Sequence, residues 1–379
     1  MISIQEKSRC CGCGACVQAC PRSCISLKDD QEGFLYPFVD QEKCIKCNAC
    51  TKVCPMQNIW NPQKPLKLFV AVNSNDNIRL ASSSGGVFSL FADLFLKKDG
   101  VVYGAAFDSN WDVHHIRIES PEYLHLLRGS KYIQSKIENT YKEVECDLKK
   151  GRQVLFSGTP CQIAGLQSFL KKKYDSLATL DFICHGVPSP GIWRKYLKEN
   201  FKKSDIKSIS FRDKFYGWNL YSICFEMKNK IFRERALRNA FMRLFILDNL
   251  TIRPSCYNCS FKNGKSNSDI TIADFWSIKK IKPEFDDNRG ASVVLCNTSK
   301  GMNLFKKIIC MYDQVDFDQI RVFNNSYSQS VAEPANRDAF WEYLGKNSVN
   351  KAALKFSYTM KGRVKRSIRV FLEFLGVKI

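Results

Sequence analysis

The sequence lacks any uncharged apolar run of the roughly 18 to 20 residues that a membrane-spanning helix requires. It also lacks a signal-peptide apolar segment, because a regular cysteine pattern already begins at Cys10. With only 12 Pro and 20 Gly among 379 residues, and 45% hydrophobic residues, the chain is not expected to be largely disordered. These absences predict a cytoplasmic protein of two or three folded domains, whose 18 cysteines are not a secreted disulfide framework.

Acidic residues are scarce: the chain has 37 Asp and Glu but 58 Lys and Arg, which gives a formal net charge of +21. No helix-turn-helix, RRM or zinc-finger signature accompanies this charge, so we do not expect nucleic acid as a partner. Two explanations stay open. The basic residues form a lysine-rich surface that keeps the protein soluble, or they form a surface that steers an acidic partner.

The cysteines follow the spacing C-x2-C-x2-C-x3-C-P twice between residues 10 and 55. This spacing resembles that of bacterial two-cluster ferredoxins, in which the fourth cysteine of each run binds the cluster of the other run. Paired zinc knuckles, the alternative, have no use for the third cysteine or for the final Cys-Pro. We therefore expect two 4Fe-4S cubes, one on Cys10, Cys13, Cys16 and Cys54, and one on Cys44, Cys47, Cys50 and Cys20.

After a proline-containing linker near residue 66, predicted strands and helices alternate. The strands are expected at residues 68–72, 101–107, 113–118, 152–156, 177–183 and 269–273. The segment Ser82 to Gly86 precedes an apolar helix that begins at Val87. A Ser- and Gly-rich turn at a helix N-terminus is typical of a phosphate cradle, although an ordinary helix cap has the same composition.

A further cysteine set comprises two single residues and one C-x2-C pair: Cys161, Cys184, Cys256 and Cys259. Thr159 and Pro160 are predicted to begin a helix, which places Cys161 in its first turn. Four thiols suffice for a third 4Fe-4S cube or for one structural zinc, or they are unrelated thiols. His185 is either a proton donor to a substrate or a hydrogen-bond donor that holds its loop.

The remaining cysteines are expected to be packing residues: Cys11, Cys24, Cys146, Cys224, Cys296 and Cys310. The pair His114 and His115 is assigned to a strand and its surface, without a role. The segment from Phe211 to Lys214 and the pair Gly217 and Trp218 receive no physical explanation from the sequence.

Taken together, the motifs resemble the beta-subunit family of coenzyme F420 hydrogenases and dehydrogenases. The resemblance is carried by Ser83-Ser84-Gly85-Gly86-Val87, Gly129-Ser130-Lys131-Tyr132, Gly158-Thr159-Pro160-Cys161-Gln162, Asp181-Phe182-Ile183-Cys184-His185-Gly186, Cys256 with Cys259, and the segment from Asp269 to Trp276. It implies FAD next to a 4Fe-4S cube on Cys161, Cys184, Cys256 and Cys259, and it includes reductases that use reduced ferredoxin. The implied FAD residues are Ser84, Gly85, Gly86, Gly129, Ser130, Lys131, Tyr132, Thr159 and Asp274. Nothing in the sequence identifies a deazaflavin pocket.

The predicted fold class is α+β: a two-cluster ferredoxin-like domain (residues 1–60), a mixed α/β flavin-binding domain in two parts (66–150 and 151–330) and a basic helical tail (331–379). The tail either contacts a membrane surface peripherally or docks on its own protein. We expect an oxidoreductase that takes electrons from an acidic carrier such as ferredoxin and reduces a small organic molecule at FAD, with His185 as the catalytic candidate. The alternatives are an electron-transfer subunit without its own substrate and a scaffold with structural metal.

Overall fold

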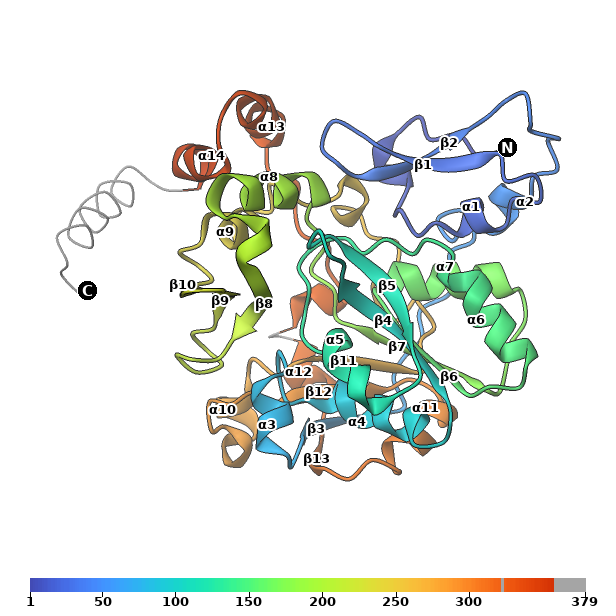
Figure 1. Ribbon diagram of the computed structural model, residues 1–379. Helices are drawn as coiled ribbons and strands as arrows, with labels where there is room; N and C mark the ends of the chain where they lie inside the picture. The colour runs from blue at the N-terminus through green and yellow to red at the C-terminus, as the bar shows by residue number, and fades with distance from the viewer. Residues whose placement is uncertain (322–323, 358–379) are drawn as a thin grey trace.

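The computed structural model describes residues 1–321 and 324–357, and its central element is an eight-stranded sheet (Figure 1). The strand order is β13-β3-β12-β11-β7-β6-β4-β5. Strands β4, β6, β7 and β11 run parallel, whereas β5, β12 and β13 are antiparallel to their neighbours. The strands span β3 Lys67–Val72, β4 Val101–Phe107, β5 Val113–Ile118, β6 Val154–Ser157, β7 Leu177–Phe182, β11 Ile270–Asp274, β12 Ser292–Cys296 and β13 Met311–Val315.

Helices cover both faces of this sheet, because its strands carry apolar side chains on both sides. On one face, Phe69 and Ala71 of β3 belong to the core under α4, α5 and α11. On the other face, Val154 and Phe156 of β6 pack against α6 and α7, and Val70 packs near α10 and α12. These helices span α4 Val87–Leu96, α5 Leu124–Leu127, α6 Thr140–Lys149, α7 Pro160–Leu170, α10 Ile278–Ile281, α11 Ser299–Phe305 and α12 Phe317–Arg321; the short α3 covers Asp76–Leu80.

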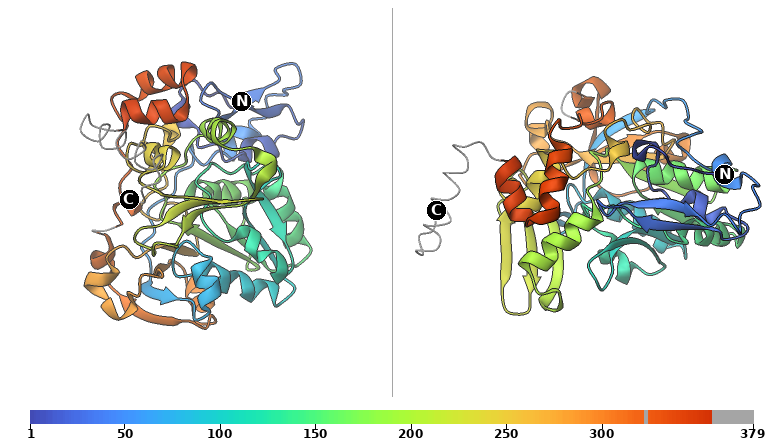
Figure 2. Two further views of the ribbon diagram at one scale, coloured as in Figure 1. Left: turned by 60° about the vertical axis from the view of Figure 1, so that its left-hand side comes forward. Right: turned by 90° about the horizontal axis from the view of Figure 1, so that it is seen from above.

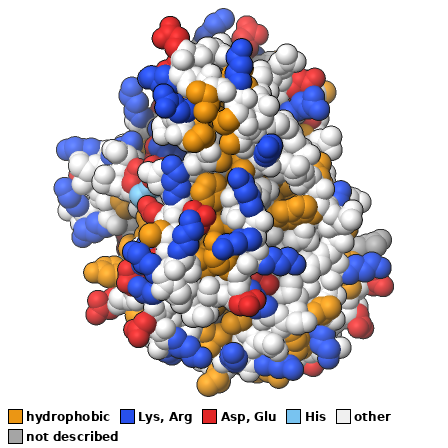
Figure 3. All heavy atoms as spheres, turned by 90° about the vertical axis from the view of Figure 1, so that its right-hand side faces the viewer, with side chains coloured by type: hydrophobic (Ala, Val, Ile, Leu, Met, Phe, Trp, Pro, Cys, Tyr) orange, Lys and Arg blue, Asp and Glu red, His pale blue; other side chains and the backbone are white. Residues whose placement is uncertain are grey.

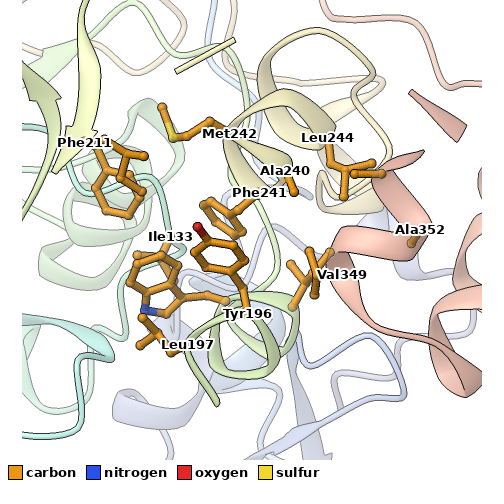
Figure 4. Close-up of a cluster of buried hydrophobic side chains, with 14 of the residues drawn as sticks. Ile133, Tyr196, Leu197, Phe211, Ala240, Phe241, Met242, Leu244, Val349 and Ala352 are labelled. Atoms are coloured by element: carbon orange, nitrogen blue, oxygen red, sulfur yellow. The ribbon is translucent and has the colours of Figure 1, made fainter. Parts of the chain in front are cut away.

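A three-stranded antiparallel sheet with order β10-β9-β8 stands beside the large sheet. Figure 4 shows the core that holds it in place: Phe211 of β8 points toward Phe241 and Met242 of α9, while Tyr196 and Leu197 approach from α8. Val349 and Ala352 of α14 close this core from the opposite side. The elements are α8 Pro190–Asn200, β8 Ile206–Asp213, β9 Ser222–Met227, β10 Ile231–Arg235, α9 Ala240–Ile246, α13 Arg337–Lys346 and α14 Val349–Phe356.

The N-terminal region is small and packs directly on the larger domain (Figures 1 and 2). Gly165 of α7 leaves no room for a side chain, since a Cβ there would lie 2.9 Å from Cβ of Cys13. A side chain on Gly33 would likewise collide with the backbone of Gly191, at the start of α8. A buried ion pair between Arg337 and Glu32 adds a second attachment. The region contains α1 Ala15–Gln18, β1 Ile25–Asp29, β2 Leu35–Val39 and α2 Ala49–Lys52.

The mixed α/β fold with a small ferredoxin-like region at its N-terminus agrees with the prediction, and the predicted strands are present within a few residues. Helix α6 begins only at Thr140, because Glu138 has a left-handed φ of 48° that a helix cannot contain. In the described parts of the chain, no helix has both the length and the apolar character needed to cross a bilayer. The basic segment 361–379 of the predicted tail lies outside the described residues.

Candidate functional site

A cavity of about 510 Å³ opens at the carboxyl ends of β6, β7 and β11, which is the edge where parallel α/β sheets bind ligands. The motifs that follow three of the parallel strands meet there. Of the predicted flavin residues, those that line the cavity are Ser84, Gly86, Gly129, Ser130, Lys131, Tyr132, Thr159 and Asp274. The volume is within the range of small-molecule and cofactor sites.

Gly85 is the one predicted flavin residue that does not line this cavity. Its Cα faces the sheet instead, where a Cβ would lie 2.5 Å from the carbonyl oxygen of Ala71 and 2.7 Å from the backbone nitrogen of Ser292. Its own N–H donates to Oγ of Ser292 at 3.0 Å. Glycine is therefore required at this position for the loop to approach the strands closely, whatever else binds nearby.

The Ser-Gly loop presents the N-terminus of α4 to the cavity. Gly86 is the N-cap residue with a left-handed φ of 79°, and no side chain caps the helix. The loop is held by its neighbours: Ser130 donates its N–H to Oγ of Ser83 at 2.7 Å, and Lys214 donates to the carbonyl oxygen of Ser84 at 2.7 Å. An uncapped N-terminus of a ten-residue helix, fixed in place, is suited to bind an anion.

A buried arginine closes the cavity from the three-stranded sheet, and no sequence motif indicated its role. Arg212, 5% exposed, donates to both carboxylate oxygens of Asp274, at 2.8 and 3.2 Å, and to the hydroxyl of Tyr132 at 3.2 Å. The guanidinium lies 4.0 Å from the ring of Tyr221 and 5.2 Å from that of Trp276. These aromatic rings give the cavity planar walls beside a fixed ion pair.

Two further basic side chains line the cavity. Burial and the neighbouring Arg128 lower the pKa of Lys131 to about 7, and its Nζ donates to the carbonyl oxygens of Leu126 and Arg128. His115 is buried rather than on the surface as the sequence predicted: its ring bonds to Oγ of Ser135 at 2.7 Å and to the carbonyl oxygen of Ser157 at 3.0 Å. Burial lowers its pKa to about 4, so the ring is neutral near pH 7.

The four cysteines of the later set line a second, smaller cavity behind the first: Cys161, Cys184, Cys256 and Cys259. Cys161 occupies the first turn of α7, and the N–H of Thr159 donates to Gln162 in the predicted cap. Burial and the nearby thiolates of Cys161 and Cys259 raise the pKa of Cys184 to about 12. His185 lines both cavities, and its Nε2 bonds to Oδ1 of Asn249 at 2.7 Å.

In the ferredoxin region, the cysteines gather across the two runs. Cys20 of the first run lines a pocket with Cys44, Cys47 and Cys50 of the second. Burial raises the pKa of Cys16 to about 12, with smaller contributions from Cys10, Cys54 and Cys50, so Cys50 and Cys54 of the second run both lie near the first run. Crossed ligation needs such proximity between the two runs, and the assignment of individual cysteines to each cube stays a prediction. Across residues 1–321 and 324–357, no three His, Cys, Asp or Glu side chains are arranged around a single metal-ion position.

Two cysteines that the sequence assigned to packing lie at these sites instead. Sγ of Cys24 is 3.3 Å from Sγ of Cys20 in the pocket of the second run. Cys11 lines the cavity of the later set, where its thiol interacts with that of Cys161. Cys146, which the sequence also assigned to packing, is exposed on α6, so that assignment is wrong for this residue. Cys11 and Cys24 stand outside the repeated spacing, so only the three-dimensional fold reveals their position.

Because Cys24 lies beside Cys20, a test of crossed ligation has to remove both thiols. Cys20→Ala alone leaves Cys24 as a substitute ligand, so we expect Cys20→Ala with Cys24→Ala to abolish the cube of the second run and spare the other. Cys54→Ala should do the reverse. Electron paramagnetic resonance of the reduced variants distinguishes the two cubes. If each variant instead loses the cube of its own run, the crossed assignment is wrong.

Comparisons with known proteins find families that match parts of this chain. Residues 151–316 match the family described as the C terminus of the coenzyme F420 hydrogenase/dehydrogenase beta subunit, and residues 9–58 and 36–88 match two 4Fe-4S dicluster domain families. No curated protein matches the chain. A chain of the xenon-derivatized F420-reducing NiFe hydrogenase complex from Methanosarcina barkeri is 13% identical, with a TM-score of 0.47, over 70% of this chain and 88% of that one.

Proposed function

We propose that this chain is an iron-sulfur flavoprotein oxidoreductase. The proposal starts from two family matches: residues 9–58 match a 4Fe-4S dicluster domain, and residues 151–316 match the C terminus of the coenzyme F420 hydrogenase/dehydrogenase beta subunit. The electron donor of this chain would be a low-potential carrier such as ferredoxin, and its substrate a small organic molecule. When bound, three 4Fe-4S cubes supply one-electron steps and FAD supplies hydride chemistry. The chain's own residues bind these groups and set their positions.

The observation that carries the proposal is the adjacency of the sites. Cys161 lies in the first turn of α7 at the later cysteine set, and one turn further Gly165 contacts Cys13 of the ferredoxin region. Residues four apart on a helix are neighbours at about 6 Å, so one helical turn separates the two ligand sets. His185 then forms a wall shared by the later set and the large cavity. The ferredoxin-like region, the later cysteine set and the large cavity thus adjoin one another, as the proposed electron path requires.

The large cavity fits FAD on three counts. The uncapped N-terminus of α4 at Gly86 offers free N–H groups to a pyrophosphate. The rings of Tyr132, Tyr221 and Trp276 supply planar walls for aromatic ring systems. The volume of about 510 Å³ leaves room for a ligand of that class. Ser84, Gly129, Ser130 and Thr159 line the same space and would bind the cofactor with polar groups.

Within this cavity the chain's own residues orient groups and hold protons. Arg212 fixes the carboxylate of Asp274, and Trp218 donates its indole N–H to the same carboxylate at 3.3 Å. Lys131, with its pKa lowered to about 7, can hold or release a proton at Nζ close to neutral pH. His185 is oriented by Asn249 and by edge-on contact with Phe245, and we propose that it contacts substrate.

The proposal is tested by cofactor content and turnover of the anaerobically reconstituted full chain. We expect about 12 iron atoms per chain, with similar acid-labile sulfide, because three cubes hold four each. We also expect about one FAD, and reduction of both cofactor types by dithionite. An iron content of about 8 atoms per chain would show that the third cube is absent. A chain that binds no flavin after reconstitution would contradict the proposal of a flavoenzyme.

The alternative is an electron-transfer subunit that passes electrons to a partner chain, which the beta-subunit description of the matched family favours. Around the second run, exposed Arg22, Lys46 and Ile45 adjoin exposed Cys47, as expected of a contact surface for an acidic redox partner. Figure 3 shows the side that carries this region, with Lys and Arg spread between hydrophobic side chains. Turnover of an organic acceptor by the isolated chain separates the two functions.

A further inference from the structure

Arg253 is a fully buried cation without a carboxylate partner. Its side chain is 0% exposed, and its three hydrogen bonds go to neutral oxygens: the carbonyls of Cys10 at 2.8 Å and Leu35 at 3.0 Å, and Oε1 of Gln134 at 2.9 Å. No ion pair joins it to any Asp or Glu in the described part of the chain. Burying a cation without a counter-charge is costly, so this site requires negative charge from another source.

The side chain crosses from the later cysteine set to the first ferredoxin run. Its backbone belongs to the later set: the N–H of Arg253 donates to Val187, and the N–H of Cys256 donates to Arg253. Its guanidinium reaches the loop between Cys10 and Cys13 so closely that a Cβ on Gly12 would lie 2.9 Å from Nη1. Because Gly12 has no side chain, the guanidinium can lie against this loop.

The groups able to supply negative charge on either side are thiolates. Cys10, whose carbonyl oxygen accepts from Nε of Arg253, flanks the guanidinium in the ferredoxin region, and Cys256 flanks it in the later set. The ring of Tyr36 covers one face at 4.3 Å and helps to exclude water. A cube ligated by four thiolates is anionic and gains a further negative charge on reduction. A cation held in a dry site beside two such cubes favours the reduced form of each.

We infer that Arg253 is the shared counter-charge of two clusters, one on Cys10, Cys13, Cys16 and Cys54 and one on Cys161, Cys184, Cys256 and Cys259, and that it raises the reduction potential of both. This inference rests on the proposed function, because it requires a cube at Cys256. Arg253 acts as a positioning residue. Its backbone lies in the loop of the later cysteine set, and its guanidinium binds the loop of the first run. Its charge sets how readily each cube accepts an electron. The cube at exposed Cys47 takes no part in this arrangement.

The test compares Arg253→Met, which removes the charge at similar length, with Arg253→Lys, which keeps it. Redox titrations of the anaerobically reconstituted full chain, followed by electron paramagnetic resonance, report each midpoint potential. In Arg253→Met we expect the ratio of reduced to oxidised cube, at fixed potential, to fall about tenfold for both flanking cubes, equivalent to about 59 mV. Arg253→Lys should shift them by less than half as much, and the cube at Cys47 should shift in neither variant.

A second variant keeps the inference falsifiable if Arg253→Met does not fold. Gln134→Glu places a carboxylate on Nη1 of Arg253 and gives the cation a counter-charge of its own, so both flanking potentials should fall in the same direction. Unchanged potentials with about 12 iron atoms retained would overturn the role of Arg253 alone. Iron near 8 in the unmodified protein would instead refute the third cube of the proposed function.

Discussion

Replacing Gly86 with aspartate should abolish flavin binding while the iron of the ferredoxin region remains in place. Gly86 is the N-cap of α4 and lines the large cavity, where no side chain caps the helix. A carboxylate there would occupy the free N–H groups and repel a pyrophosphate. Because the left-handed φ of Gly86 strains any side chain at this position, the test needs a control with the same strain and no charge.

Gly86→Asn is the matched control. Both side chains must accept the left-handed φ of 79°, and both place a Cβ 3.1 Å from Cβ of Asn73, so strain is equal and only the charge differs. We expect the asparagine variant to keep much more flavin than the aspartate variant. The measurement is flavin released by heat denaturation, together with iron content. Stoichiometric flavin in Gly86→Asp would mean that the pyrophosphate binds elsewhere.

Removing the thiol of Cys161 should lower the iron content from about 12 to about 8 atoms per chain and stop the reduction of flavin by the ferredoxin region. Since Cys11 lies beside Cys161 and can replace it as a ligand, the decisive variant combines Cys161→Ala with Cys11→Ala. Flavin should still bind, because the large cavity keeps its walls. Rapid mixing with reduced ferredoxin should then show reduced cubes beside oxidised flavin.

The control for this prediction is Cys146→Ala. Cys146 is exposed on α6 and lines none of the three cavities described above, so its removal should change neither iron nor electron transfer. If Cys161→Ala with Cys11→Ala retains about 12 iron atoms and reduces flavin at the normal rate, the later cysteine set does not hold a cube.

Local sequence signals predicted the parts of the site that depend on neighbouring residues. The cap of α7 is set by Thr159 and Pro160 and could be foreseen, as could the loop that follows β7 at Cys184. Arg212 could not, because its strand belongs to a separate sheet whose position over the cavity depends on packing against α8, α9 and α14. His115 shows the same limit: alternation places it on a strand, but only tertiary contacts with Ser135 and Ser157 bury it.

The contact between Gly165 and Cys13 also constrains how the protein is built in the cell. Cys13, Cys16 and Cys54 are buried, and α7 lies against Cys13 so closely that no other molecule fits between them. A delivery protein that hands over a preformed cube needs access to those thiols. If Cys13 binds a cube as predicted, that cube has to be inserted before the N-terminal region closes on α7, whereas exposed Cys47 of the second run remains accessible to a delivery protein after folding.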